Sequence, residues 1–313
     1  MPLQLSPLPA ERFEEWRSAA RQRVIDGNRA SGHRIGADAV DFADAFFAEL
    51  LPDGLATPTV RILRIVDEHE RELGTLWLAV GEHKLFLLEL AVEEPLSDAR
   101  NDDVLAQILA IARDRGVARI SAPLFPHDAA GHALLEGRGF EVASIQMVLE
   151  PLPVREVPVH VDVVPMTAER FPRFVAASEK GFADDLVASG RYSPEEAAAE
   201  SHRQLVAELP EGVETKGQAL FTASVDGAEV GILWLGMRVR DGRPHAFVLD
   251  IEVDTAERRK GYGRALMHAA EREARRLGAD SIGLHVFGFN TGAIDLYEQL
   301  GYRRTEESLL REL

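Results

Sequence analysis

The sequence predicts an α/β (α+β) chain built from two copies of one domain in tandem. Three observations support this. Segments of the first half return in the second half at a nearly constant spacing. In each half, stretches with the alternating pattern of strands are interspersed with stretches of helical spacing. A proline-rich stretch separates the halves. We therefore expect each copy to form a sheet with helices on its faces.

Matching residues in the two halves identify the repeat directly. Pro-Leu-Pro-Ala-Glu-Arg-Phe at residues 7–13 recurs as Pro-Met-Thr-Ala-Glu-Arg-Phe at residues 165–171. Gly-Thr-Leu-Trp-Leu at residues 74–78 returns as Gly-Ile-Leu-Trp-Leu at residues 231–235. Shared composition does not keep a spacing this constant over more than half a copy, so duplication is the better interpretation.

The join between the copies lies at residues 151–159, where three prolines predict a stiff, extended linker or an edge strand. The expected domains are residues 1–150 and residues 160–313. The first elements of each copy are helices, at residues 10–27 and 167–190, followed by another helix that ends at a Leu-Pro-acid-Gly turn. The strands that follow are expected at residues 60–66 and 74–80 in the first copy and 219–225 and 229–238 in the second. A central strand, a helix, a strand, a last helix and a C-terminal strand complete each copy.

Composition excludes several classes of protein. The formal charge of −17 repels nucleic acid and anionic membrane surfaces, so neither is an expected partner. No apolar run approaches the ~20 residues that cross a bilayer, and no secretion signal is visible, so the expected location is the cytoplasm. The chain has no cysteine, and no cluster of other ligand residues has convincing metal-binding spacing, so no metal is expected. The excess of acid favours a cationic substrate such as an amine, or serves only solubility. The sequence does not indicate an oligomeric state.

The chemistry is expected at residues 249–266, where a strand runs through a loop into a helix. Apolar side chains alternate along the strand, and the helix that follows is stopped by Gly278. The loop between them, residues 258–263, reads Arg-Arg-Lys-Gly-Tyr-Gly. Free amides and the helix dipole make such a junction an anion site, and glycines let a ligand come close. This loop is therefore expected to hold a phosphate-bearing cofactor; the alternative is a tight turn and nothing more.

Two known phosphate-binding patterns do not fit this loop. No P-loop string is present, and Leu266 stands where a dinucleotide fingerprint needs its third glycine. The loop does match Arg/Gln-x-x-Gly-x-Gly/Ala between a strand and a helix. Residues 290–302 match Asn-x-x-Ala-x-x-Leu-Tyr-x-x-x-Gly-Phe/Tyr. In carrying both patterns in this order, the second half resembles the GNAT superfamily of acyl-CoA N-acyltransferases.

The resemblance implies a mixed sheet that splays open between its central strands to admit acetyl-CoA. Gly261 and Gly263 would cradle the pyrophosphate, and backbone amides near residues 251–253 would polarise the thioester carbonyl. Asn290 would contact the pantetheine arm, cap its helix, or do both. Arg259 and Lys260 would be outer phosphate contacts or solvated surface charges. The full set expected at the cofactor is Ile251, Val253, Arg258, Arg259, Lys260, Gly261, Tyr262, Gly263, Arg264, Asn290 and Ala293.

The resemblance also implies catalytic residues. Tyr297 would protonate the leaving thiolate of coenzyme A; the alternative is an aromatic residue that only packs the helix on the sheet. Direct attack by an amine needs a general base, for which Asp250, Glu252 and His285 are candidates. Glu252 is favoured because the first copy has an alanine opposite it, whereas Asp250 keeps an acidic counterpart there.

The first copy lacks the residues that carry these motifs. Its central strand is retained, but Asp102 stands opposite Gly263, and Leu135 opposite Tyr297. Carboxylates in that loop would repel phosphates. We therefore expect a degenerate N-terminal domain without a cofactor site of its own, the alternative being a cofactor bound through an altered loop.

These observations predict an N-acetyltransferase that moves an acetyl group from acetyl-CoA to a primary amine of a small molecule or peptide by direct attack. One alternative is a non-catalytic acyl-CoA-binding or regulatory protein, which the presence of Tyr297 disfavours. Another is an acetyltransferase like mycothiol synthase, whose tandem architecture is similar. A purely structural role for both copies would require the loop motif to be accidental.

Overall fold

The computed structural model describes residues 3–155, 161–190 and 192–313. The chain divides into two compact units. The first comprises the residues up to Ile145 together with Arg304–Leu313, and the second is Gln146–Arg303. The elements follow one another in the same order in both halves of the chain, namely strand, two helices, three strands, helix, strand, helix and strand. This confirms the predicted α+β class and the duplication.

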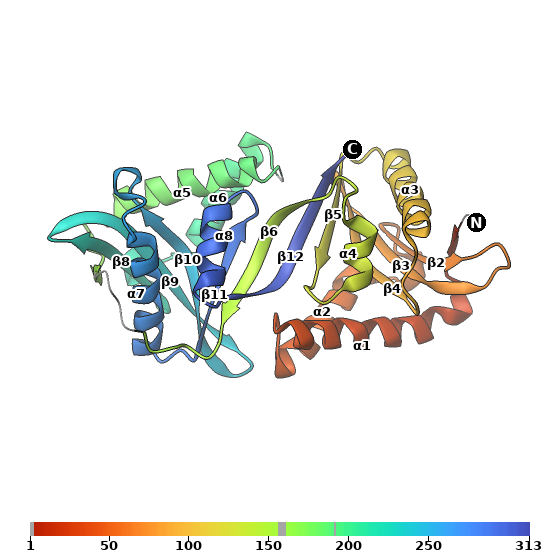
Figure 1. The fold of residues 1–313 in the computed structure, drawn as a ribbon, viewed down its shortest axis with the longest axis horizontal. Helices are drawn as coiled ribbons and strands as arrows, with labels where there is room; N and C mark the ends of the chain where they lie inside the picture. Colours follow the sequence, from red (N-terminus) through yellow and green to blue (C-terminus); the bar gives the residue numbers. More distant parts are fainter. Residues whose placement is uncertain (1–2, 156–160, 191) are drawn as a thin grey trace. The chain divides into compact units, whose positions relative to one another are not determined.

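The elements from the first half of the chain run from red to yellow-green in Figure 1. They are β1 (Gln4–Pro7), η1 (Ala10–Arg12), α1 (Phe13–Ser31), α2 (Gly36–Leu50), η2 (Gly54–Ala56), β2 (Val60–Val66), β3 (Glu72–Val80), β4 (Lys84–Val92), α3 (Asp98–Asp114), β5 (Arg119–Leu124), α4 (Ala129–Leu135) and β6 (Glu141–Leu149). Those from the second half are β7 (Asp162–Pro165), α5 (Phe171–Ala188), α6 (Pro194–Glu208), η3 (Gly212–Glu214), β8 (Gln218–Val225), β9 (Ala228–Arg240), β10 (Arg243–Val253), η4 (Thr255–Glu257), α7 (Tyr262–Arg276), β11 (Ser281–Phe287), α8 (Thr291–Gln299) and β12 (Arg303–Glu312). None of the helices among the described residues is both long and apolar enough to cross a membrane.

In the strand order, β1-β2-β3-β4-β5-β12 belong to the first unit and β11-β10-β9-β8-β7 to the second, and β6, a neighbour of β11, is divided between the units after Ile145. The C-terminal strand therefore completes the first unit, where β12 pairs antiparallel with β5 (Figure 1). Its Leu309 joins the apolar core of that unit. The expected domain ranges, 1–150 and 160–313, assign this strand to the second copy. Alternation identifies a segment as a strand but does not indicate which sheet edge it pairs with.

In each unit the strand pairing is mixed, and the sheet of the second unit opens where the resemblance implies. β10 pairs in parallel with β11 only as far as Val248 opposite Leu284, although β10 continues to Val253 and β11 to Phe287. On its other edge, β10 stays paired with β9, with a register shift between Val248 and Asp250. A bulge of this kind bends the bulged strand. The splayed sheet is thereby confirmed.

The first unit repeats this feature. β4 pairs with β5 only up to Phe86 and continues to Val92, and its register with β3 also shifts once. Glu89 lies opposite Trp77 in the first unit, and Asp250 lies opposite Trp234 in the second. These two acids therefore occupy the same register position of the duplicated sheet.

Helices cover both faces of the second sheet. Phe174 of α5 packs with Ile232 and Trp234 of β9. Leu233 and Leu235, whose side chains point to the opposite face, are fully buried as well. The apolar side of α7, including Leu266 and other buried residues, packs against β9, β10 and β11. α5 and α7 therefore lie on opposite sides of the open strand. Of the expected linker, residues 156–159 lie outside the described residues.

Candidate active site

The loop between β10 and α7 has the geometry of an anion site. Gly261 is the N-cap of α7 and has φ 84°, a conformation that only glycine adopts without strain. Neither the backbone conformation nor the packing requires glycine at position 263. A Cβ added there would meet only Leu296 Cδ2, at 3.6 Å. The protein itself therefore leaves the space at Gly263 free. The first amides of α7 point out of the helix end, as they do in helices that bind phosphate.

The basic residues of this loop have different contacts. Arg258 Nε donates to the carbonyl of Val253 at 3.2 Å, and so ties the loop back to β10. Lys260 forms an ion pair of 2.9 Å with Glu257. Arg264 donates to Gln299 Oε1 at 2.5 Å and thereby links α7 to α8. Arg259 has φ 64°, a left-handed conformation in a non-glycine residue.

Backbone amides line the open edge of β10. Asp254 N donates to Val230 O at 2.9 Å, toward β9. Because amides alternate in direction along a strand, those of Val253 and Ile251 point away from β9, to the side that β11 has left. The amide of Ile251 also bonds the carboxylate of Asp250. Glycine is required at Gly231 of β9, since a Cβ there would lie 2.0 Å from the carbonyl oxygen of Glu252.

The two candidate carboxylates lie in different environments. Asp250 Oδ2 accepts a hydrogen bond of 2.6 Å from Ser178 Oγ of α5. Burial, with a smaller effect from the charges of Glu252 and Asp185, raises the pKa of Asp250 to about 6. The Glu252 side chain is 52% exposed and lies 3.8 Å from Arg258 Nη2. Asp250 thus combines enclosure with a pKa of about 6, the property of an effective general base.

Tyr297 lies near this carboxylate. Its side chain on α8 is buried, and its ring packs 5.9 Å from that of Tyr302, measured between centroids. Burial, followed by the charge of Asp250, raises the pKa of Tyr297 to about 12. The phenol therefore keeps its proton throughout the physiological range, as a proton donor requires.

Other predicted residues lie at the starts of α7 and α8 and in β11. Asn290 is the N-cap of α8, where its Oδ1 accepts from the amide of Ala293 at 3.3 Å. This confirms the capping alternative for Asn290, and the pantetheine contact stays a prediction. Tyr262 is the first residue of α7. His285 lies in β11 with its ring edge-on to Phe287.

Sequence reasoning missed two polar residues of α5. Ser178 follows the buried Phe174 by four positions, so both lie on the helix face toward the sheet. Asp185 lies two turns further, and burial together with the charges of Asp184 and Glu252 raises its pKa. A polar residue one turn after a core phenylalanine is the signal that could have identified Ser178.

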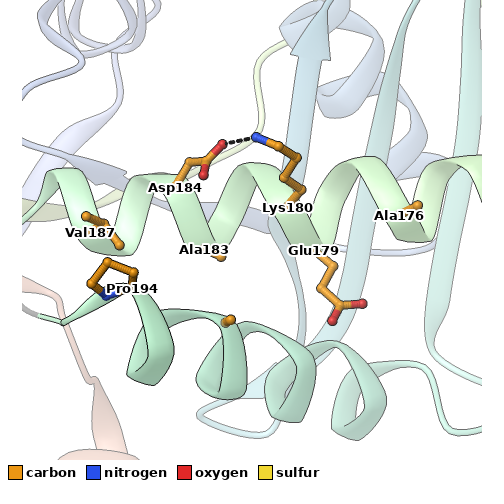
Figure 2. Close-up of a pocket in the computed structure, with 8 residues that line it drawn as sticks. Ala176, Glu179, Lys180, Ala183, Asp184, Val187 and Pro194 are labelled. Atoms are coloured by element: carbon orange, nitrogen blue, oxygen red, sulfur yellow. Dashed lines mark hydrogen bonds and ion pairs between the residues drawn. The ribbon is translucent and has the colours of Figure 1, made fainter.

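A separate groove lies between α5 and α6, with a volume of about 360 Å³. Figure 2 shows its small apolar residues on facing sides of the two helices, with the ion pair of Lys180 and Asp184 at its edge. Its lining residues are Ala176, Glu179, Lys180, Ala183, Asp184, Val187, Pro194 and Ala198. Ser178 does not line it, so this groove is distinct from the opening at Asp250.

Known proteins share this arrangement of sequence and fold. Residues 183–302 match the acetyltransferase (GNAT) family. The chain is 30% identical over 152 residues to the uncharacterized N-acetyltransferase YycN of Bacillus subtilis, which covers 48% of this chain and 97% of that protein. The chain belongs to the GNAT family of acetyltransferases. The predicted enzyme class is thereby confirmed, and the family uses acyl-CoA.

Two further similarities were found, one along the whole chain and one over a short segment of it. The crystal structure of a GCN5-related N-acetyltransferase from Sphaerobacter thermophilus is 14% identical, with a TM-score of 0.52, and covers 99% of this chain and 95% of that one. It shows the GNAT fold along both halves. Mycothiol acetyltransferase of Propionibacterium freudenreichii is 38% identical over 76 residues, 24% of either chain.

Proposed function

We propose that the second unit of this GNAT protein transfers an acetyl group from acetyl-CoA to a primary amine of a small molecule or peptide. The observation that carries the proposal is the placement of Asp250 and Tyr297. The carboxylate has a pKa of about 6 and the phenol a pKa of about 12. Each group is therefore in the protonation state that its role requires at neutral pH. We therefore assign the role of general base to Asp250. The comparison of the two copies, by contrast, favours Glu252.

The residues present fit acyl-CoA. Gly261, Gly263 and the first amides of α7 would hold the pyrophosphate, with Arg259 and Lys260 outside them. Asn290 and Ala293 would meet the pantetheine arm at the start of α8. The thioester supplies an activated acetyl carbonyl and a thiolate leaving group.

The proposed reaction is direct attack. Asp250 takes a proton from the acceptor ammonium, and the neutral nitrogen attacks the thioester carbonyl carbon. The outward amide of Val253 stabilises charge on the carbonyl oxygen. As the C–N bond forms and the C–S bond breaks, Tyr297 gives its proton to sulfur. The acceptor loses two protons in all, of which one ends on coenzyme A and one in solvent after Asp250 and Tyr297 return to their starting states.

The side-chain contacts of the first unit support the proposal of a single acyl-CoA site per chain, in the second unit. Glu89, at the register position of Asp250, accepts two hydrogen bonds from Arg23 of α1, at 2.8 and 3.0 Å. Asp102, opposite Gly263 in the repeat, accepts from Arg138 at 2.6 Å. Both positions are thus occupied by internal ion pairs, and we propose that the first unit binds no acyl-CoA.

The test is a screen of primary amines for release of free coenzyme A thiol from acetyl-CoA, with the wild type beside Tyr297→Phe. Turnover that falls at least about tenfold in Tyr297→Phe supports the proposal. Acetyl-CoA binding without turnover on any amine or aminoacyl compound would favour the non-catalytic binding protein instead.

A second candidate acceptor is that of mycothiol acetyltransferase. The similarity over 76 residues to that enzyme favours it.

A further inference from the structure

The start of the linker lies along α7 of the second unit. Leu152 N donates to Asp280 O at 3.2 Å, just beyond α7. Arg275, in the last turn of α7, donates to the carbonyl of Pro153. Arg155 then reaches into the unit with two contacts of its own. The segment is therefore fastened to the helix that follows the cofactor loop.

The first contact of Arg155 is with a buried carboxylate. Its Nε donates to Glu271 Oε2 at 2.8 Å, and only 2% of the Glu271 side chain is exposed. Burial raises the pKa of Glu271, and Arg155 opposes this effect. Arg275 acts in the same direction as Arg155. Glu271 Oε1 has no hydrogen-bond partner in the described part of the chain, so Arg155 supplies the main compensation for this charge.

The second contact of Arg155 is with the end of α8. Its Nη2 donates to the carbonyl of Leu300, the C-cap residue of the helix that carries Tyr297. Tyr302 N donates to Tyr297 O at 3.0 Å, and the rings of these two tyrosines pack together. The charge of Glu271 acts on the buried phenol of Tyr302. The guanidinium of Arg155 thus connects Glu271 of α7 to the C-terminal end of α8, the helix that contains Tyr297.

We propose that Arg155 is a positioning residue that fixes the orientation of Tyr297 by tying Glu271 of α7 to the C-terminal end of α8. The inference rests on the proposed function in assigning Tyr297 the role of proton donor. Its consequence is that the linker between the two copies belongs to the catalytic apparatus. Loss of Arg155 removes one of the contacts that hold the end of α8 and leaves Glu271 buried without its ion pair.

The cofactor loop should not respond to this change. Glu271 lies nine residues after Tyr262, which is about 14 Å along the helix. The contacts of the loop with β10 and with Gln299 do not involve Arg155. Positioning of Tyr297 therefore predicts a loss of turnover without a loss of acetyl-CoA affinity.

The experiment is NMR of the full chain labelled with ¹³Cζ-tyrosine. The chain has four tyrosines, so each resonance can be assigned from one Tyr→Phe variant. Arg155→Ala should move the resonances of Tyr297 and Tyr302 and leave those of Tyr192 and Tyr262 in place. Arg155→Lys, which keeps the charge, should move them less. The matched control is Arg276→Ala, which removes an exposed arginine of the same helix that pairs with Glu273 and should move none of the four.

Two outcomes would overturn the inference. An unmoved Tyr297 resonance in Arg155→Ala would mean that the tie does not reach the phenol. Movement of all four resonances would indicate a general folding role. If Arg155→Ala does not fold, Arg155→Lys decides on the same criterion, because its Tyr297 resonance must still move.

Turnover separates this inference from the proposed function. Arg155→Ala should lower kcat about tenfold and change the Kd for acetyl-CoA less than twofold. In a Tyr297→Phe background it should lower kcat no further, because residues that act as one unit are not additive. If Tyr297→Phe itself keeps the full rate, the proposed proton donor is wrong, while the NMR result still decides whether Arg155 orients that side chain.

Discussion

Ser178 Oγ donates a hydrogen bond of 2.6 Å to Asp250 Oδ2 and so connects α5 to the bulged strand of the second sheet. At the same register position of the first sheet, Glu89 is held by Arg23 of α1. Burial raises the pKa of Asp250 to about 6, and its partner Ser178 is neutral, whereas the carboxylate of Glu89 is occupied by an ion pair with a guanidinium. This difference supports our proposal that Asp250 is the general base and that Glu89 has no such role.

Asp250→Asn should lower kcat by about 10² to 10³, because an amide cannot take the proton of the acceptor. Glu252→Gln is the matched control on the same strand and should cost less than about tenfold, since its half-exposed side chain is in contact with solvent. Steady-state kinetics with the best amine of the screen measures both. A larger loss in Glu252→Gln than in Asp250→Asn would reverse the assignment.

The pH profile of kcat/KM should follow the pKa of Asp250. The base must be ionised, so the rate is full above this pKa of about 6 and falls as the pH drops through it. Ser178→Ala removes a hydrogen bond that lowers the pKa, so the midpoint should move upward. The pKa of about 12 for Tyr297 predicts no loss of activity through this group below pH 10. An acid limb that stays in place in Ser178→Ala would contradict the role of Asp250.

Asp250→Asn should make the folded protein more stable at pH 7. The ordinary pKa of an aspartate side chain is 3.8, and the pKa of Asp250 in the folded protein is about 6, so the ionised form is disfavoured by folding. Below pH 4 the group is protonated in both states and the penalty is absent; above pH 6 it is complete. Urea unfolding should therefore give a gain of about 1–3 kcal/mol at pH 7 that disappears near pH 4. A gain for Asp250→Asn that persists at pH 4 would count against a buried carboxylate.

Arg23→Ala should leave acetyl transfer within about twofold of the wild type, because the ion pair with Glu89 lies in the unit that we propose binds no acyl-CoA. A modest fall in unfolding free energy, about 1 kcal/mol, is expected from a partly exposed pair. Kinetics and urea unfolding of the same preparation measure both. A rate loss above tenfold with unchanged stability would mean that the first unit takes part in the reaction.

Much of the fold follows from local sequence pattern. The repeat predicted both units, and the glycines and cations at residues 258–263 located the turn into α7, because a left-handed N-cap at Gly261 has a strong residue preference. The pairing of β12 with β5 of the first unit did not follow from the sequence. The alternation of β12 is the same whichever strand it pairs with. Strand partnership is decided by tertiary contacts such as the burial of Leu309.

The candidate site was predictable in its backbone and less so in its side chains. Tyr297 and Asn290 were named from the motif at residues 290–302 and its resemblance to the GNAT pattern, and both carboxylates from their place on the expected central strand. The comparison of the two copies favoured Glu252. The enclosure of Asp250 was not predictable, because both side chains point to one face and only the packing of α5 encloses one of them. Ser178 and Arg155 carry no motif. Their roles depend on contacts across 72 and 116 positions of sequence, which no local pattern encodes.

The central claim is one acyl-CoA site per chain, at the start of α7, and calorimetric titration with acetyl-CoA tests it most directly. The wild type should bind one equivalent. Gly263→Glu, which places a carboxylate in the space meant for phosphate, should lose at least about 100-fold in affinity. Gly181→Glu, at an exposed position of α5 with open space around it, should bind like the wild type. Two equivalents per chain, or undiminished binding in Gly263→Glu, would contradict the account.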